Sequence, residues 1–295
     1  MSTPSFDDRE GFIWMDGDIL PWRESKVHVL THAMHYGSAV FEGQRAYAGE
    51  VFKLEEHTAR LFNSARMLDF EIPWQEDQIN EACREILRVN NLEDAYLRPI
   101  AWRGSEQMGV SAQKTKIHVG IAAWQWPSYF SQEARLKGLK VTISKWRRPD
   151  PMTAPALSKA AGLYMICTMS KHAAEAAGYD DAMMFDWQGR VAELTGANVF
   201  FVSGKEIHTP IADCFLDGIT RRTAIQLAKQ RGYEIIERRI MPEEMADFEQ
   251  AFCTGTAAEI TPLAQIGEYS FEVGPIIKQL MDDYDNLVHR RALAA

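Results

Sequence analysis

The fold of this chain is constrained most by an interruption of its strand and helix pattern at residues 127–138. Short apolar runs and amphipathic segments alternate before the interruption and again after it. Proline, serine and charged residues fill the interruption, as is typical of segments between domains. The chain has 295 residues, enough for two medium domains. We therefore expect a small N-terminal domain at 1–126, an interdomain linker at 127–138 and a larger C-terminal domain at 139–295.

Local signals indicate that the chain mixes helices with strands. Asp16-Gly17 lies between apolar runs and predicts a hairpin over 12–22, and Ala48-Gly49 predicts another over 39–54. We also expect a strand over 26–30. Apolar residues recur at helical spacing over the ranges 57–68, 74–89, 162–177, 218–231 and 273–293. The predicted fold class is α+β (an α/β chain of two domains), with a mostly antiparallel N-terminal sheet.

The charge of the chain excludes one large class of partner. A net charge of -9 and a pI of about 5.4 argue against nucleic-acid binding, because neutralising phosphates requires a basic surface. Lys145, Arg147 and Arg148 form a dense basic cluster, but a cluster this short is typical of a solvated strand end. The cysteines have no paired spacing, so we expect neither a zinc set nor disulfides, and a reducing compartment.

The apolar runs of the chain are all shorter than the roughly 18 residues that span a membrane. Residues 1–10 are polar and acidic and lack the basic and apolar parts of a signal peptide. We therefore expect a cytoplasmic protein without a membrane partner.

His32 and His35 are close in sequence, but no carboxylate or thiol has matching spacing, so we expect packed histidines and no metal.

Lys159 has small and apolar neighbours on both sides, from Ala154 to Leu157 and from Ala160 to Gly162. Such surroundings remove water from an ammonium group, which lowers the pKa of a lysine. An amine that deprotonates near neutral pH attacks carbonyls and can form a Schiff base. The alternative is a lysine at a helix start that extends its head into water. The local sequence leaves both interpretations open.

Two turns with small residues have the pattern of anion-binding sites. Residues 217–221 begin a predicted helix, whose free amides and dipole favour a phosphate. Residues 255–258 follow a predicted strand and could present amides in the same way. Each is equally consistent with a plain turn or helix cap.

Glu193, between apolar residues, is either an exposed strand carboxylate or the partner of a buried cationic nitrogen. Glycine-rich dinucleotide, Walker and Gly-x-Ser-x-Gly patterns are missing from the sequence.

The chain carries a series of motifs in a fixed order. They are His35-Tyr36-Gly37, Val40-Phe41-Glu42-Gly43, His57-x-x-Arg60-Leu61, Tyr96-Leu97-Arg98-Pro99, Met108-Gly109-Val110, Lys159, Tyr164, Glu193-Leu194-Thr195-Gly196-x-Asn198, Leu216-x-Gly218-Ile219-Thr220-Arg221 and Gly255-Thr256-Ala257. Over nearly its full length the chain resembles the class IV pyridoxal phosphate aminotransferases, of fold type IV, and within them the branched-chain amino-acid aminotransferases. The resemblance implies a small N-terminal α/β domain, a larger C-terminal domain with a pseudo-barrel of strands, and a cofactor at the domain interface.

The resemblance implies pyridoxal 5'-phosphate as the cofactor. Lys159 would form the Schiff base and would be the catalytic acid and base. Glu193 would pair with the pyridinium nitrogen, Tyr164 would bind the phenolate oxygen, and Arg60 would bind the phosphate. Further cofactor contacts would come from Leu216, on the pyridine face, and from Gly218, Ile219, Thr220 and Thr256.

Substrate contacts are implied in the same way. Tyr96 and Arg98 alternate along a predicted strand, so both point to one face, and Arg98 would receive the distal carboxylate of glutamate. The amides of Thr256 and Ala257 would hold the α-carboxylate. Phe41, Trp126 and Tyr129 would form the walls of an apolar pocket for the substrate side chain. Gly43 would also belong to the substrate-binding residues. In the family, residues at the positions of Tyr36 and Val110 reach into the neighbouring subunit, which implies a homodimer at least and leaves a hexamer open.

The implied reaction moves an amino group between leucine, isoleucine or valine and 2-oxoglutarate. The small-molecule partners would be these amino acids and 2-oxoglutarate or glutamate, in amino-acid biosynthesis or catabolism. Three sister activities on the same fold stay open: D-amino acid transamination, (R)-amine transamination and aminodeoxychorismate lysis. A cofactor-binding protein without turnover is the alternative from another class. Leu163 replaces the asparagine that is usual before the tyrosine, and Leu194-Thr195 replaces smaller residues, although neither change removes a group that the chemistry needs.

Overall fold

The computed structural model of the protein describes residues 5–126 and 136–290. The described residues form two compact units. The first unit contains the described residues up to Trp126 together with Ser158–Gly162, and the second contains the rest. Lys159 therefore packs with the N-terminal unit, although it follows the predicted linker in sequence. Most of that predicted linker lies outside the described residues.

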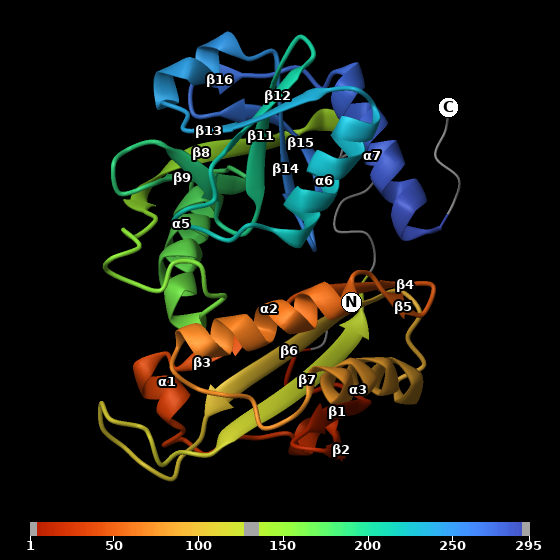
Figure 1. The fold of residues 1–295 in the computed structure, drawn as a ribbon, viewed down its shortest axis with the longest axis vertical. Coiled ribbons are helices and arrows are strands. Elements are labelled where there is room, and N and C mark those ends of the chain that lie inside the picture. The colour runs from red at the N-terminus through yellow and green to blue at the C-terminus, as the bar shows by residue number, and fades with distance from the viewer. Residues whose placement is uncertain (1–4, 127–135, 291–295) are drawn as a thin grey trace. The chain divides into compact units, whose positions relative to one another are not determined.

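The first unit is built on an antiparallel sheet (Figure 1). Its strands are β1 (Phe12–Met15), β2 (Asp18–Pro21), β3 (Ala39–Phe41), β4 (Gln44–Tyr47), β5 (Glu50–Val51), β6 (Ala95–Arg103) and β7 (Ile117–Gln125). Their order is β2-β1-β7-β6-β4-β5, with β3 also paired to β6. The β1–β2 and β4–β5 pairs confirm both predicted hairpins. The predicted strand at 26–30 is wrong, since those residues form a turn and irregular backbone.

Two amphipathic helices of the first unit, α2 (Leu54–Met67) and α3 (Glu76–Val89), pack against this sheet. Leu61 from α2 and Ile79 from α3 share one apolar core with Leu97 and Ala101 from β6. Because side chains alternate along a strand, Tyr96 and Arg98 lie on the opposite face of β6 from Leu97. A short helix, α1 (His32–Tyr36), and a 3-10 turn, η1 (Trp22–Glu24), complete the unit.

The second unit contains a closed ring of strands. Its strands are β8 (Leu139–Arg147), β9 (Asp181–Phe185), β10 (Val191–Leu194), β11 (Asn198–Ser203), β12 (Glu206–Pro210), β13 (Glu234–Arg238), β14 (Gln250–Gly255), β15 (Glu259–Ile266) and β16 (Tyr269–Ser270). Pairing runs β10-β9-β8-β15-β14-β11, and the antiparallel pair Glu193–Asn198 joins β11 back to β10. This ring is the predicted pseudo-barrel, and Glu193 lies where it closes.

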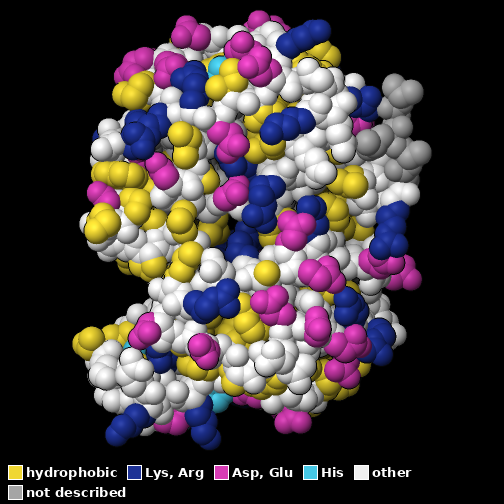
Figure 2. Space-filling model, viewed as in Figure 1, with side chains coloured by type: hydrophobic (Ala, Val, Ile, Leu, Met, Phe, Trp, Pro, Cys, Tyr) yellow, Lys and Arg dark blue, Asp and Glu magenta, His cyan; other side chains and the backbone are white. Residues whose placement is uncertain are grey.

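The helices of the second unit are η2 (Ala161–Leu163, which begins in the first unit), α5 (Tyr164–Ala176), α6 (Ile219–Gln230), η3 (Pro242–Asp247) and α7 (Pro275–Val288). Val141, Met183, Val199 and Leu263 form the centre of its apolar core. Within 5–126 and 136–290, no helix combines the length and apolarity needed to cross a membrane. Figure 2 shows basic and acidic side chains interspersed over both units on the face in view.

Candidate active site

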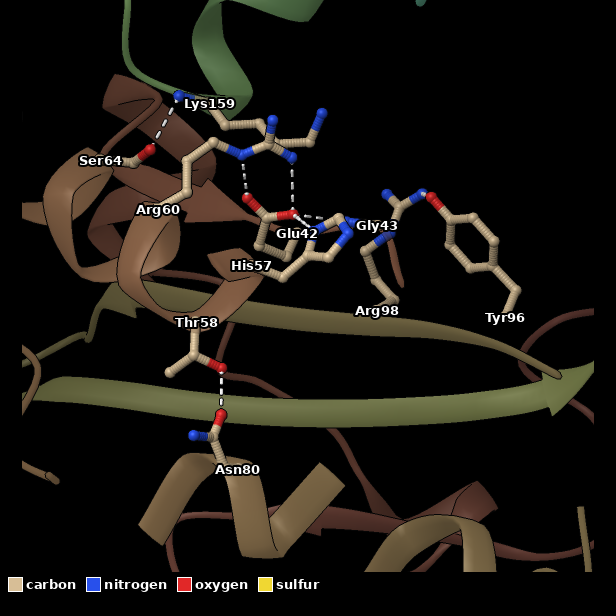
Figure 3. Close-up of polar contacts among 10 residues, drawn as sticks. All are labelled: Glu42, Gly43, His57, Thr58, Arg60, Ser64, Asn80, Tyr96, Arg98 and Lys159. Carbon is tan, nitrogen blue, oxygen red and sulfur yellow. Dashed lines mark hydrogen bonds and ion pairs between the residues drawn. The ribbon is translucent and has the colours of Figure 1, made fainter. Parts of the chain in front are cut away.

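The backbone of Lys159 is fixed on both sides within the first unit. Its carbonyl accepts a hydrogen bond from the Phe41 N–H at 3.1 Å, and Ala160 forms an antiparallel bridge with Val40. Its own N–H donates to Ser64 Oγ at 3.0 Å (Figure 3). The half-buried side chain extends so that Nζ lies 5.2 Å from the centre of the Phe41 ring. The amine is thus held by rigid backbone contacts beside an aromatic face.

Helix α2 presents Arg60 next to a buried acid, Glu42. His57 and Arg60 are three residues apart, so they share one face of the helix. Glu42 is fully buried and receives Arg60 Nε at 2.7 Å, Arg60 Nη2 at 2.9 Å and His57 Nδ1 at 2.7 Å (Figure 3). Burial alone would raise the pKa of Glu42, but Arg60 and His57 overcome this and hold the pKa well below its usual range. Arg60, the predicted phosphate ligand, is therefore paired with an ionised carboxylate.

Four of the predicted substrate residues meet in the first unit. Arg98 Nη2 donates to the Tyr96 hydroxyl at 3.2 Å, and the Arg98 guanidinium lies 4.7 Å from the centre of the Phe41 ring. Tyr96 also packs against Trp126, with ring centres 5.2 Å apart. One cation therefore lies among aromatic rings, an arrangement that can receive either an apolar side chain or a carboxylate. Tyr129, the other predicted wall, lies outside the described residues.

Gly43 is required by the close approach of Tyr96. A Cβ built at position 43 would lie 2.0 Å from the Tyr96 hydroxyl oxygen. The Tyr96 ring has little room to yield, because it is buried and has Trp124 and Trp126 as neighbours. Gly43 therefore acts on the substrate residues through Tyr96, and not through a side chain of its own.

We expect Gly43→Ala to raise the KM for both substrates and to lower the free energy of unfolding by about 1–3 kcal/mol, as overpacking does. Denaturant unfolding and steady-state kinetics measure the two effects. Gly120→Ala is the matched control, because a Cβ there meets its nearest atom at 3.4 Å, an ordinary contact. Unchanged KM values in Gly43→Ala would show that the close approach has no role in substrate binding.

In the second unit Glu193 is buried beside Arg148. Glu193 is 8% exposed, Arg148 is 4% exposed, and Arg148 Nε lies 3.3 Å from Glu193 Oε1. Burial would lower the pKa of Arg148, but Glu193 raises it, with a smaller contribution from Tyr164. Arg148 is therefore charged, and Glu193 is not the exposed strand carboxylate that its sequence left open.

Arg148 is the residue that sequence reasoning missed. It was expected to belong to a solvated strand end, but only Lys145 and Arg147 of the basic cluster are exposed. The Arg148 guanidinium also lies 3.5 Å from the Cys214 carbonyl and 3.6 Å from Cys167 Sγ. These partners lie in separate segments of the chain, so the local sequence carries no signal for its burial.

The predicted anion-binding turn at 217–221 leads into helix α6. Gly218 precedes the first turn of α6, and no side chain caps that helix. Asn198 Nδ2 donates to the Leu216 carbonyl at 3.0 Å, which fixes the loop, and a Cβ at Gly218 would lie 2.2 Å from Asn198 Oδ1. Gly218 therefore makes room for the Asn198 side chain, and the amides of Ile219 and Thr220 lie in the uncapped first turn of α6, a position that suits a phosphate.

The second predicted turn, at 255–258, connects β14 to β15. A Cβ at Gly255 would lie 3.3 Å from the Gly196 carbonyl oxygen, so the turn also packs closely against the loop after Glu193. Thr256 and Ala257 are half-buried.

Tyr36 and Val110 lie on an exposed part of the first unit. Tyr36 is 47% exposed and Val110 is 88% exposed. His32 links their segments, because its ring stacks on Tyr36 and its Nε2 lies 2.8 Å from the Gly109 carbonyl. Its other ring nitrogen lies 2.7 Å from Ser38 Oγ, and His35 Nε2 lies 2.9 Å from the Val29 carbonyl. These histidines have protein partners, and they shape an apolar surface.

Comparison with known proteins identifies the family. The family model for amino-transferase class IV matches residues 39–266. This chain belongs to the class IV aminotransferases. The branched-chain-amino-acid aminotransferase of Pseudomonas aeruginosa is 42% identical to it over 291 residues, which cover 96% of this chain and 95% of that protein.

Solved structures of the T.th. branched-chain amino acid aminotransferase are also similar to the chain. The complexes with pyridoxamine 5'-phosphate, N-(5'-phosphopyridoxyl)-L-glutamate and 4-methylvaleric acid have TM-scores of 0.93, 0.91 and 0.90, at 38%, 37% and 36% identity. Each comparison covers 96% of both chains. The fold is therefore fold type IV, as predicted, and the cofactor of this aminotransferase is pyridoxal 5'-phosphate.

The residues present fit this cofactor. The first turn of α6, whose amides no side chain caps, suits its phosphate. The buried Glu193–Arg148 pair would offer a carboxylate for its ring nitrogen. Lys159, whose backbone is fixed, would supply an amine for its aldehyde.

Proposed function

We propose that this aminotransferase moves the amino group between a branched-chain L-amino acid and 2-oxoglutarate, with the cofactor held on Lys159 as a Schiff base. The observation that carries the proposal is Arg98 among the rings of Phe41 and Tyr96. Apolar rings suit leucine, isoleucine or valine, and the guanidinium suits the distal carboxylate of 2-oxoglutarate. The similar T.th. enzyme was solved with a glutamate derivative and with 4-methylvaleric acid, which supports both parts.

The cofactor supplies an electron sink for the carbanion that forms when the substrate Cα loses its proton. We assign the removal and return of that proton to Lys159 Nζ. Glu193 is assigned to the ring nitrogen, and Arg148 Nε, 3.3 Å from its Oε1, positions this carboxylate. Tyr164 is assigned to the phenolate oxygen and Leu216 to the ring face. Arg60 and the first amides of α6, with Thr256, are assigned to the phosphate, and the Thr256 and Ala257 amides to the substrate α-carboxylate.

We also propose that the enzyme works at least as a homodimer. Tyr36 and Val110 are assigned to a substrate site, yet they lie on an exposed surface of the first unit. Val29 and Met34, 66% and 62% exposed, extend this apolar surface beside them. A second copy of the chain that covers this surface would receive both residues at its own site.

Relative rates with several amino donors test the substrate class. We expect L-leucine, L-isoleucine and L-valine to react with 2-oxoglutarate at least tenfold faster, in kcat/KM, than D-alanine or (R)-phenylethylamine, a discrimination of about 1.4 kcal/mol. Preference for D-alanine or for (R)-phenylethylamine would assign one of the sister activities instead. Bound cofactor without any turnover would support a binding protein.

Arg98→Ala is expected to reduce kcat/KM for 2-oxoglutarate by about 10- to 100-fold, the loss typical of one charge-assisted hydrogen-bonding group. Because the branched oxo acids have no distal carboxylate, their kcat/KM falls much less. The measurement is the half-reaction of the pyridoxamine form with 2-oxoglutarate and with 4-methyl-2-oxopentanoate. Equal losses for both oxo acids would contradict the assigned role.

A further inference from the structure

Glu42 is a fully buried carboxylate to which no step of the reaction has been assigned. It lies between β3 and β4, and its backbone N–H donates to the Pro99 carbonyl at 2.7 Å, which fixes it to β6. Three side-chain N–H groups converge on its two oxygens, two from Arg60 and one from His57, as Figure 3 shows. The backbone N–H of Gly43 also donates to Oε2, at 3.3 Å. A buried acid with this many charge-assisted bonds holds its partners in a defined geometry.

The charges of this cluster follow from its contacts. Glu42 is ionised, as its lowered pKa shows. Burial lowers the pKa of His57, and contact with Glu42 offsets this only in part, so the imidazole is neutral near pH 7. A carboxylate only accepts hydrogen bonds, so neutral His57 carries its proton on Nδ1 and donates it to Glu42. The cluster of Glu42, Arg60 and His57 therefore has no net charge in the interior.

The two bonds from Arg60 set the direction of its guanidinium. Nε donates to one carboxylate oxygen of Glu42 and Nη2 donates to the other. This bidentate pair allows only one orientation of the planar guanidinium. The N–H groups on the other edge then point away from Glu42. The Arg60 side chain is 15% exposed. An arginine without such a partner loses rotamer freedom when it binds an anion.

We propose that Glu42 is a positioning residue that orients Arg60 for the phosphate of pyridoxal 5'-phosphate. The inference rests on the proposed role of Arg60. Placing Glu42 near the phosphate has an electrostatic cost, because the two negative charges repel each other. If orientation dominates, removing the charge weakens cofactor binding. If charge repulsion dominates, removing the charge strengthens cofactor binding. The direction of the change in affinity therefore distinguishes the two effects.

The test is the dissociation constant of the apoenzyme for pyridoxal 5'-phosphate and for pyridoxal, which lacks the phosphate, each titrated by protein fluorescence. The preference for the phosphorylated ligand, taken as the dissociation constant of pyridoxal divided by that of pyridoxal 5'-phosphate, isolates the phosphate contribution. We expect Glu42→Gln to reduce this ratio by about 10- to 100-fold, since a glutamine cannot accept all three side-chain N–H groups and charge-assisted bonds are lost. Glu42→Asp keeps the charge but shortens the reach, and we expect a smaller reduction.

Arg60→Ala and the double variant complete the experiment. If Glu42 acts through Arg60, adding Glu42→Gln to Arg60→Ala causes no further reduction of the ratio. Thr58→Val is the control for helix α2, because it removes the Thr58–Asn80 hydrogen bond of 2.6 Å from the same helix without touching Glu42. We expect this control to lower the free energy of unfolding and to leave the ratio unchanged.

Several results would overturn the inference. A higher ratio in Glu42→Gln, or equal weakening of both ligands, means that Glu42 does not orient Arg60 for the phosphate. A ratio that falls in Arg60→Ala but not in the Glu42 variants has the same meaning and leaves the Arg60 assignment intact. A ratio unaffected by Arg60→Ala shows instead that Arg60 does not bind the phosphate.

Discussion

Replacing Lys159 with alanine is expected to abolish transamination and the visible absorption band of the bound cofactor. The variant lacks the amine that attaches the aldehyde and the base that moves the Cα proton. Loss of positioned proton transfer alone costs about 10²- to 10⁴-fold in rate, and loss of covalent attachment adds to it. Turnover of L-leucine with 2-oxoglutarate and an absorption spectrum of the purified variant measure the two losses.

Lys116→Ala is the control for this variant, because Lys116 is an exposed lysine of the same unit. We expect it to keep the turnover and the spectrum of the unsubstituted enzyme. Since the backbone of position 159 is fixed by Ser64 and β3, the alanine variant should also keep its fold, which circular dichroism checks. Wild-type turnover in Lys159→Ala would refute the assignment of this residue.

Arg148→Met is expected to lower the free energy of unfolding by about 3–5 kcal/mol, because it leaves the Glu193 charge buried without its guanidinium partner. The carboxylate then gains a proton more readily and no longer offers a full charge to the ring nitrogen. We therefore expect turnover to fall as well. Denaturant unfolding of the cofactor-loaded enzyme and steady-state kinetics give the two quantities.

Two further variants separate charge pairing from packing. Arg147→Met changes the neighbouring exposed arginine and should alter stability by no more than about 0.5 kcal/mol. Arg148→Met combined with Glu193→Leu removes both buried charges, so it should recover most of the stability but none of the turnover. A double variant as unstable as Arg148→Met alone would show that the methionine disrupts packing and not the charge pair.

Local sequence patterns predicted the secondary structure correctly where the backbone preferences of single residues determine it. Asp16 and Gly17 have φ values of 53° and 102°, the left-handed conformation that the Asp-Gly pattern predicts for a hairpin turn. The local preference for a strand was misleading at 26–30. Valine and leucine favour strands there, but Val27, Val29 and Leu30 are exposed and pair with no strand of the described chain.

The site was predictable in part. Alternation along β6 placed Tyr96 and Arg98 together, and their hydrogen bond confirms the shared face. The assignment of Lys159 to the first unit was not predictable, since it depends on Ser64 and Val40, far away in sequence. The Arg148–Glu193 and Arg60–Glu42 pairs likewise join distant segments, so no local pattern reveals which charged residue is buried.

The most direct test of the central claim is to find the lysine that carries the cofactor. The enzyme is loaded with pyridoxal 5'-phosphate, reduced with borohydride, digested and mapped by mass spectrometry. We predict a phosphopyridoxyl group on Lys159 and on no other lysine. Modification of a different lysine, or none at all in protein that binds the cofactor, would contradict the account.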